Sequence, residues 1–220
     1  MSSHSPKKAL FAAFASVARA LGSEHRLDLL EHLAQGERSV EKLAERTGIP
    51  FASVSQHLQA LRNAGLVAAR RDGRRVLYGL ADDGVIRLVD ALREVAERRN
   101  GEAERVIAGY FHDRDGLEPV SRKELLARMK TGVVTVLDVR PPDEFACGHL
   151  PGALNIPLSE LRKRLAELPP KQEVVAYCRG PWCVLAFEAV ALLRKHGHKA
   201  RRLDGGLPEW KVAGLPVRMG

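Results

Sequence analysis

Cys178 is the residue in this sequence whose position best suits chemistry. It follows an apolar segment, 173–177, that is predicted to be a buried strand, and a helix is predicted to begin near Cys183 or Val184. Backbone N–H groups and the positive end of a helix dipole then point at the Cys178 sulfur, and both favour the thiolate form. The sequence therefore predicts a nucleophilic cysteine in a short loop. The alternative is an inert cysteine at the end of a core strand.

Phosphatase chemistry at Cys178 is not expected. Phosphatase loops of the Cys-x5-Arg type close with a guanidinium that clamps the phosphate. In this chain Val184 occupies that place.

Strands and helices are predicted to alternate around Cys178. Ser121 is the expected N-cap of a helix, and the continuous apolar run 133–139 is typical of a strand in a buried parallel sheet. Further helix and strand patterns follow up to Leu203. Such alternation predicts a small α/β domain with a parallel sheet covered by helices.

The first half of the chain has a different pattern, made of short helices and a hairpin. Apolar residues recur at helical spacing in four segments, and Ser39 and Pro50 are placed to begin the third and fourth helices. Two strand-like segments are joined by Asp72-Gly73, a two-residue hairpin signal. The long helix expected after Asp82 is either continuous or interrupted at Asn100-Gly101. These parts make a mainly α winged helix-turn-helix.

Two stretches of this half resemble the ArsR (SmtB/ArsR) family of dimeric bacterial repressors. They are Ser53-Val-Ser-Gln-His-Leu-Gln-Ala-Leu-Arg-Asn-Ala-Gly-Leu-Val and Arg70-Arg-Asp-Gly-Arg-Arg-Val-Leu-Tyr-Gly-Leu. The resemblance covers about residues 9–110. It implies a repressor that binds double-stranded operator DNA as a homodimer, paired through its first and last helices.

The charge and polarity of this half suit DNA contact. The chain has a formal net charge of +8, most of it in residues 119–220, but the segment 51–80 is locally basic. Polar side chains of the fourth helix can contact base edges or phosphates, and arginines of the hairpin suit phosphate or minor-groove contact. The candidate DNA-binding residues are Ser53, Ser55, Gln56, His57, Gln59, Arg62, Arg70, Arg71, Arg74 and Arg75.

We do not expect metal sensing, although many members of the family that this half resembles are metal sensors. Residues 1–110 contain no cysteine, which removes the thiolate metal sites. The last helix of this half has Asp90 but no histidine before His112. We therefore expect no metal site, and any sulfur response must come from the second half.

Four motifs of the second half resemble the single-domain rhodanese family. They are Leu137-Asp-Val-Arg140, Glu144-Phe-Ala-Cys-Gly-His-Leu-Pro-Gly-Ala153 with Asn155-Ile-Pro157, Tyr177-Cys-Arg-Gly180, and Leu203-Asp-Gly-Gly-Leu-Pro-Glu-Trp210. The resemblance implies that the Cys178 thiolate takes a sulfane sulfur from a small donor such as thiosulfate or polysulfide. The covalent persulfide on Cys178 then passes its sulfur to a thiophilic acceptor, and no other cofactor is expected.

The residues near Cys178 take roles from this resemblance. Arg179 is the candidate for holding an anionic donor, and Asp138 and Arg140 are expected to shape the charge of the site. Cys183 departs from the commoner pattern and is either a resolving thiol that attacks the persulfide or a small residue in the helix core. Cys147 and His149 are expected to be structural. The active-site loop comprises Gly180, Pro181, Trp182 and Cys183.

We predict a winged helix-turn-helix domain at 1–112, a linker at 113–118 and a rhodanese-like domain at 119–220. Three cysteines, an odd number, indicate a reducing cytoplasm, and no apolar run is long enough to suggest a membrane partner. The leading hypothesis is a transcriptional repressor whose rhodanese-like domain senses or transfers sulfane sulfur through a Cys178 persulfide. The alternatives are a thiosulfate-type sulfurtransferase in which the winged helix serves localisation or dimerisation, and a binding module without transfer activity.

Overall fold

The computed structural model describes residues 5–112 and 119–220, so the predicted linker at 113–118 lies outside the described residues. The chain divides into two compact units between Val89 and Asp90, here called unit 1 and unit 2. Residues 90–112 pack with unit 2, and the predicted domain bounds stay predictions. Within the described ranges, no helix is long and apolar enough to cross a membrane.

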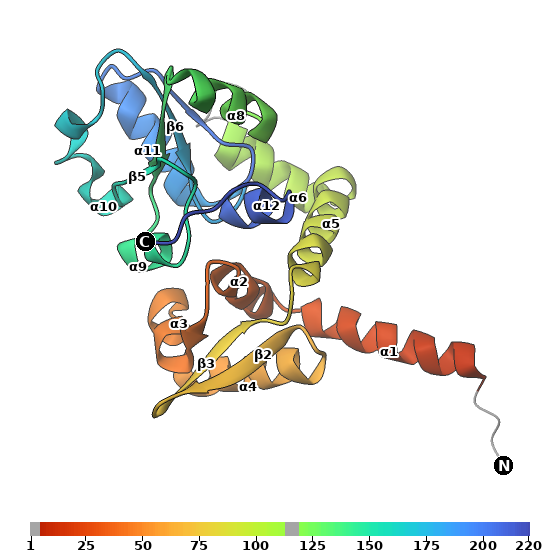
Figure 1. Cartoon of the computed structure of the whole chain (residues 1–220). Coiled ribbons are helices and arrows are strands. Elements are labelled where there is room, and N and C mark those ends of the chain that lie inside the picture. The colour runs from red at the N-terminus through yellow and green to blue at the C-terminus, as the bar shows by residue number, and fades with distance from the viewer. Residues whose placement is uncertain (1–4, 113–118) are drawn as a thin grey trace. The chain divides into compact units, whose positions relative to one another are not determined.

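Unit 1 contains the predicted bundle of short helices (Figure 1). The Ser39 hydroxyl caps the third helix by accepting a hydrogen bond from the Lys42 N–H at 3.4 Å, and Gly48 ends that helix at a φ of 70°. The buried stripe predicted for the fourth helix is confirmed, since Val54, Leu58 and Leu61 have no solvent exposure. The helices are α1 (Pro6–Leu21), α2 (Glu24–Leu33), α3 (Val40–Thr47) and α4 (Phe51–Asn63).

The wing is the antiparallel pair β2 (Val67–Asp72) and β3 (Arg75–Leu80). Asp72 pairs with Arg75, so the two turn residues are Gly73 and Arg74 rather than the predicted Asp72-Gly73. Gly73 has a φ of 60°, whereas Arg74, like every other non-glycine residue of the described chain, does not have a positive φ. A positive φ at the first central residue alone is typical of a type II′ turn. A short strand that the sequence did not indicate, β1 (Arg38–Ser39), pairs with the other edge of β3.

The long helix after the wing is interrupted at Asn100. Helix α5 (Gly84–Arg99) ends there, and α6 (Gly101–Val106) continues into the π-helix η1 (Ile107–His112). The Asn100 side-chain oxygen accepts hydrogen bonds from the N–H groups of Glu102 and Ala103 at 2.9 and 3.1 Å. It therefore acts as an N-cap, which breaks one helix and starts the next.

Unit 2 is built on a parallel sheet with the strand order β5-β4-β6-β7. The strands are β4 (Val134–Asp138), β5 (Leu154–Asn155), β6 (Glu173–Tyr177) and β7 (Ala200–Arg202). The helical segments are α8 (Arg122–Thr131), α9 (Pro142–Ala146), α10 (Leu158–Leu161), η2 (Leu165–Glu167), α11 (Val184–Lys195) and α12 (Leu207–Val212).

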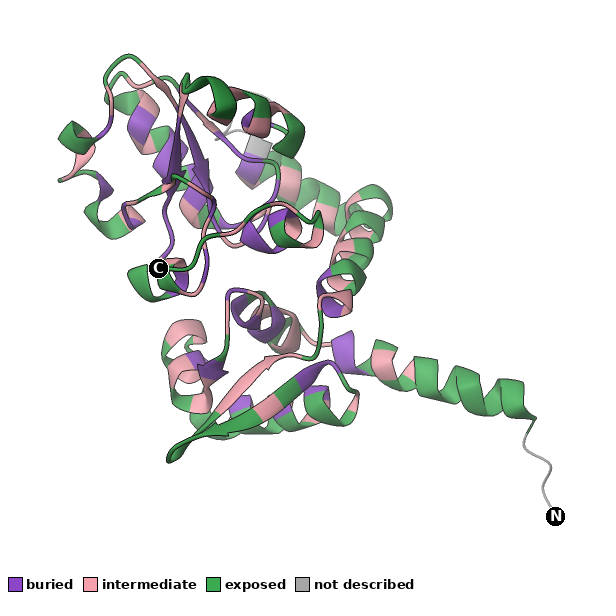
Figure 2. Ribbon diagram, viewed as in Figure 1, coloured by how far each residue is buried: buried purple, intermediate pink, exposed green. Residues whose placement is uncertain are grey.

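Both faces of this sheet are covered, as predicted. Val174 and Ala176 of β6 belong to one apolar cluster with α11, whereas Val175 and Tyr177 belong to another with α8 and α12. Successive side chains of a strand point to opposite faces, so two separate clusters require helices on both sides. Figure 2 shows the strands as the buried centre of this unit. The predicted α/β class with a parallel sheet is confirmed.

Truncation of a buried side chain of α4 tests the core of unit 1. Leu58→Ala removes a side chain with no exposure, and we expect the free energy of unfolding to fall by about 2–5 kcal/mol. Urea denaturation followed by circular dichroism measures the change. The neighbouring Gln59→Ala, on the exposed face, should change it by no more than about 0.5 kcal/mol. Equal effects of the two substitutions would contradict the packing.

Candidate functional site

Cys178 and Cys183 lie at the two ends of the loop between β6 and α11. Cys178 follows the last residue of β6 and has no solvent exposure, and Cys183 is the N-cap of α11. Their Cα atoms are 6.1 Å apart, and the two sulfurs form a disulfide. The Cys183 N–H donates to the Gly180 carbonyl oxygen at 3.2 Å, which tightens the loop. The structure thus brings together the predicted nucleophile and the predicted resolving thiol, while the reactivity of each stays a prediction.

The backbone of Gly206 supports the loop from one side. A Cβ atom at this position would approach backbone atoms of Cys178 and Arg179 more closely than 3.0 Å. The next residue, Leu207, donates its N–H to the Cys178 carbonyl oxygen at 3.3 Å. Only glycine allows this approach, so the Leu203–Trp210 motif holds the cysteine loop through its backbone.

Arg179 is held by Glu144, a residue to which the sequence analysis assigned no role. The Arg179 Nε and Nη2 atoms donate to the two Glu144 oxygens at 3.0 and 2.7 Å. Glu144 is only 2% exposed, so it offers a fixed carboxylate to the guanidinium. The predicted contact of Arg179 with an anionic donor stays a prediction, and the pair shows how the side chain is oriented.

Asp138, the last residue of β4, and Arg140 form an ion pair with no solvent exposure. The Arg140 Nη2 atom lies 2.6 Å from Asp138 Oδ2 and also donates to the Gly148 carbonyl oxygen at 2.8 Å. The Arg140 guanidinium lies 5.5 Å from the ring centroid of Tyr177, the residue before Cys178. Burial, reinforced by Asp138, raises the pKa of Tyr177, which keeps the phenol neutral. The predicted influence of this pair on the charge of the site stays a prediction.

Trp182 connects the loop to residues of α5 and η1 that the sequence analysis did not single out. Its indole N–H donates to the Glu97 carboxylate. The Phe111 ring centroid lies 4.9 Å from that of Trp182 and 4.8 Å from that of Phe187. The guanidinium of Arg202 lies 4.4 Å from the Phe187 centroid. All of these residues belong to unit 2, so part of its aromatic core lies directly beside the loop.

The residues predicted to contact DNA on α4 lie opposite its buried stripe. Ser55, Gln56, Gln59 and Arg62 are exposed, and Ser53 and His57 are half-buried. The helix thus presents a polar face suited to a DNA groove.

His57 has a histidine neighbour that the sequence analysis did not pair with it. Its ring centroid lies 5.5 Å from that of His25. Burial lowers the pKa of His57, as do the charges of His25 and Arg26, so the neutral ring is favoured. Across the described ranges, no group of three or more His, Cys, Asp or Glu side chains is arranged to hold a metal ion.

The wing arginines differ in their surroundings. Arg71, Arg74 and Arg75 are exposed around the turn. Arg70 is bound by Glu37, with its Nε atom 2.8 Å from one carboxylate oxygen, a partner that lies far away in the sequence. Part of the predicted positive charge of the wing is therefore neutralised within the protein.

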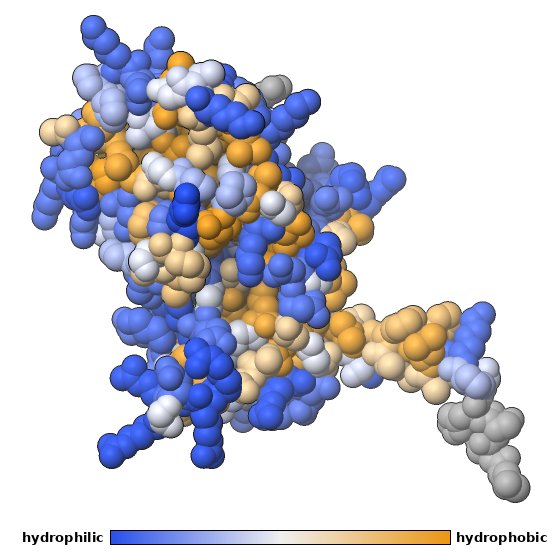
Figure 3. All heavy atoms as spheres, viewed as in Figure 1, coloured by the Kyte–Doolittle hydropathy of each residue, from blue (hydrophilic) through white to orange (hydrophobic). Residues whose placement is uncertain are grey.

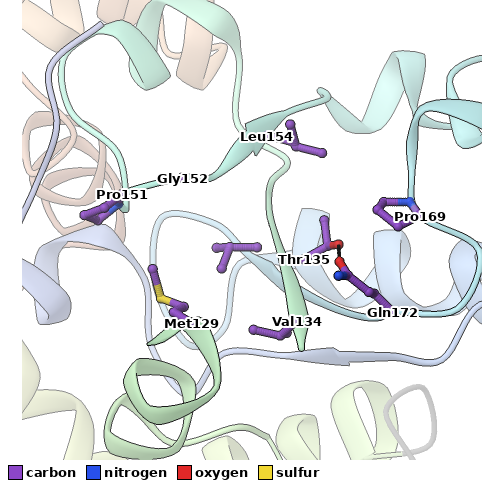
Figure 4. Close-up of a pocket in the computed structure, with 9 residues that line it drawn as sticks. Met129, Val134, Thr135, Pro151, Gly152, Leu154, Pro169 and Gln172 are labelled. Atoms are coloured by element: carbon purple, nitrogen blue, oxygen red, sulfur yellow. Dashed lines mark hydrogen bonds between the residues drawn. The ribbon is translucent and has the colours of Figure 1, made fainter. Parts of the chain in front are cut away.

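A pocket of about 320 Å³ lies away from the cysteine loop (Figure 4). Thr135 and Gln172 face each other in it, with the Thr135 hydroxyl donating to the Gln172 side-chain oxygen at 2.8 Å. These residues stand at the starts of β4 and β6, whereas Cys178 follows the end of β6. Ligands of open α/β sheets bind outside the carboxyl ends of the strands. We therefore place the candidate site at the cysteine loop.

Comparison with known proteins gives matches for both halves. Residues 23–69 match the model of the bacterial regulatory protein, arsR family, and residues 121–213 match that of the rhodanese-like domain. The chain is 44% identical over 214 residues to an HTH-type transcriptional regulator of Mycobacterium tuberculosis, covering 97% of this chain and 94% of that protein. It is 35% identical over 85 residues to a sulfurtransferase of Allochromatium vinosum, covering 38% of this chain and 78% of that protein.

Among solved structures, a similar one is the homodimeric winged helix-turn-helix DNA-binding domain of a possible ArsR-family transcriptional regulator from Mycobacterium bovis. It is 41% identical and covers 46% of this chain and 93% of that chain, with a TM-score of 0.42.

Substitution of Gly206 tests its support of the loop. We expect Gly206→Ala to displace the Cys178 backbone, to lower the free energy of unfolding by about 1–3 kcal/mol, and to slow formation of the Cys178–Cys183 disulfide. Urea denaturation of the reduced protein and mass spectrometry of timed oxidation measure these effects. Gly101→Ala, where an added Cβ meets open space, is the matched control. Wild-type stability and oxidation rate in Gly206→Ala would contradict the close approach.

Neutralisation of Glu37 tests the charge of the wing. Glu37→Gln releases Arg70 from its carboxylate partner, so we expect tighter DNA binding. The slope of the logarithm of the binding constant against the logarithm of salt concentration should become steeper by about one, because one more phosphate is contacted. Fluorescence anisotropy over a series of salt concentrations measures both. Glu45→Gln makes the same change of charge at a carboxylate paired with Lys42 and should have the smaller effect. Identical salt slopes for the two variants would mean that Arg70 does not reach DNA.

Proposed function

Because the chain belongs to the ArsR family of transcriptional regulators and carries a rhodanese-like domain, we propose that it is a repressor controlled by sulfane sulfur at Cys178. The observation that most supports this proposal is that Cys178 and Cys183 lie at the two ends of one loop of unit 2, within bonding distance of each other. Unit 1 contains no cysteine. A sulfur signal therefore enters through unit 2.

The first chemical step is transfer of one sulfur atom to Cys178. Its thiolate attacks the outer sulfur of thiosulfate, the S–S bond of the donor breaks, and sulfite leaves with the electron pair. The product is a Cys178 persulfide, and a polysulfide donor reacts in the same way with a shorter polysulfide as the leaving group. The N–H groups of the loop and the N-terminus of α11 favour the anionic sulfur in both states.

The second step uses Cys183. Its thiolate attacks the Cys178 sulfur of the persulfide, hydrosulfide leaves, and the Cys178–Cys183 disulfide forms. An external dithiol reduces this disulfide and returns the loop to its starting state. The sequence left open whether Cys183 reacts, and the 6.1 Å between the two Cα atoms supports the resolving role.

DNA binding in this proposal uses the polar face of α4 and the arginines of the wing, acting on operator DNA in the cytoplasm. A dimer supplies two copies of this surface for the two halves of an operator. Helix α1 supports a homodimer, because Leu10, Phe11 and Phe14 are each more than half exposed on it. Figure 3 shows α1 as a largely hydrophobic surface, which a second copy would cover.

The proposal is tested by the DNA affinity of the full-length protein. We expect its Kd for the DNA upstream of its own gene to rise by about 5–150-fold after treatment with polysulfide, and to recover with a reductant. Fluorescence anisotropy at fixed salt measures the Kd. Cys178→Ser should bind the same DNA and lose the response.

Substitution of the other two cysteines completes this test. Cys183→Ser should accumulate the Cys178 persulfide in mass spectra, since it lacks the second thiol. Cys147→Ser should behave as the wild type, because Cys147 lies at the end of α9 rather than in the loop. A Cys178→Ser protein that still releases DNA on polysulfide treatment would contradict the proposal.

A second candidate function is a thiosulfate-type sulfurtransferase in which the winged helix provides localisation or dimerisation. The similarity of unit 2 to a sulfurtransferase supports it. Sustained turnover of thiosulfate with cyanide as acceptor, together with DNA binding that ignores sulfur, would favour the enzyme. A single stoichiometric persulfidation with negligible turnover would favour the sensor.

A further inference from the structure

We propose that residues 90–112, here called the coupling arm, respond to the state of the Cys178–Cys183 pair through two side chains of α5, Arg93 and Glu97. The coupling arm comprises the second part of α5 together with α6 and η1. The inference rests on the proposed function, because it assigns the route by which a sulfur signal reaches the DNA-binding half.

The first contact of the coupling arm is with Trp182. This residue lies next to Cys183, so a change in the disulfide acts directly on its backbone. Its indole N–H donates to Glu97, and its ring packs against Phe111 of η1 at a centroid distance of 4.9 Å. Phe111 is only 9% exposed, so a shift of the indole disturbs a packed aromatic group rather than solvent.

The second contact is with Glu209 of α12. One Glu209 oxygen accepts from the Gly206 N–H at 2.7 Å, and Gly206 is the residue whose backbone supports Cys178. The other oxygen lies 3.7 Å from the Arg93 guanidinium. A displacement of the loop at Cys178 therefore reaches α5 by a route that does not include Trp182.

The two contacts meet on one face of α5. Arg93 and Glu97 are separated by one helical turn and form an ion pair at 3.3 Å. Arg93 also lies 3.2 Å from Asp90, so one guanidinium joins three carboxylates, of which Glu209 is the nearly buried one. The same helix begins at Gly84, and Val85 belongs to the apolar core of unit 1. Residues 84–89 of α5 belong to unit 1, and residues 90–99 belong to unit 2.

The coupling arm can distinguish the closed state of the cysteine pair, the disulfide, from its two open states, the dithiol and the persulfide. In the disulfide, the ends of the loop are tied together beside Trp182. In the dithiol or the persulfide, that bond is absent, and the persulfide adds a sulfur atom in a site without solvent exposure around Cys178. Because interiors are close-packed, the added atom must displace a neighbour of the loop. Two discrete arrangements of one packed element are the physical basis of coupling between distant sites.

Substitution of Glu97 separates coupling from sulfur chemistry. Glu97→Ala removes the acceptor for Trp182 and a partner of Arg93, whereas Glu97→Gln keeps an oxygen that accepts from both. We expect Glu97→Ala to form the Cys178–Cys183 disulfide like the wild type, by mass spectrometry, and to bind operator DNA normally when reduced. Its change of Kd on polysulfide treatment should be smaller than that of the wild type. The double variant Arg93→Ala/Glu97→Ala, which also removes the contact with Glu209, should respond by less than about 3-fold, against about 5–150-fold in the wild type.

Glu94→Ala is the matched control on the same helix, since Glu94 is exposed and pairs with Arg98. Glu94→Ala and Glu97→Gln should both keep the wild-type response. A full response in Arg93→Ala/Glu97→Ala, with normal disulfide formation, would overturn the inference and leave the proposed function intact.

Hydrogen exchange tests the inference without DNA. In the full-length wild type, the amides of 97–111 should exchange at different rates in the dithiol and disulfide states, and Glu97→Ala should reduce the difference. If polysulfide does not change the DNA affinity of the wild type, the proposed function fails. The exchange data still decide whether the coupling arm responds to the state of the cysteine pair. Equal exchange of 97–111 in the two states would overturn it.

Discussion

The ion pair of Asp138 and Arg140 has no contact with solvent, and the carboxyl edge of the sheet is arranged around it. A buried charge without its partner costs several kcal/mol, so the two side chains must stay together. Arg140 also binds the Gly148 carbonyl oxygen and lies over the Tyr177 ring, which joins the ends of β4 and β6 to the segment after α9. That segment follows the helix carrying Glu144, the partner of Arg179, so the geometry beside Cys178 depends on the pair.

Local and periodic features of this chain could be predicted from the sequence, because they depend on neighbouring residues. The buried stripe of α4, the Ser39 cap and the alternation around the parallel sheet are examples. The wing turn was misplaced by one residue, since Asp72-Gly73 and Gly73-Arg74 satisfy similar turn preferences and the pairing of Asp72 with Arg75 decides between them.

Partners distant in the sequence could not be predicted in the same way. Glu144 precedes Arg179 by 35 residues, and Glu97 precedes Trp182 by 85. Each is one of many acidic residues until the fold brings it to its partner. The short strand β1 was not predicted either, because its two residues form a strand only by pairing with the distant β3. Reasoning from the sequence was therefore enough to single out Cys178, and the fold was needed to identify the side chains that surround its loop.

The division of the chain between Val89 and Asp90 has a consequence for building hybrid regulators. Exchange of the C-terminal half at residue 118 would keep Phe111 and discard its aromatic partners Trp182 and Phe187. The hybrid would then expose a large apolar ring, and it would lack Trp182, the partner of Glu97, and Glu209, a partner of Arg93. A junction within α5 ahead of Asp90 moves these residues together with their partners. The unit that can be exchanged intact thus begins inside α5 rather than at the predicted linker.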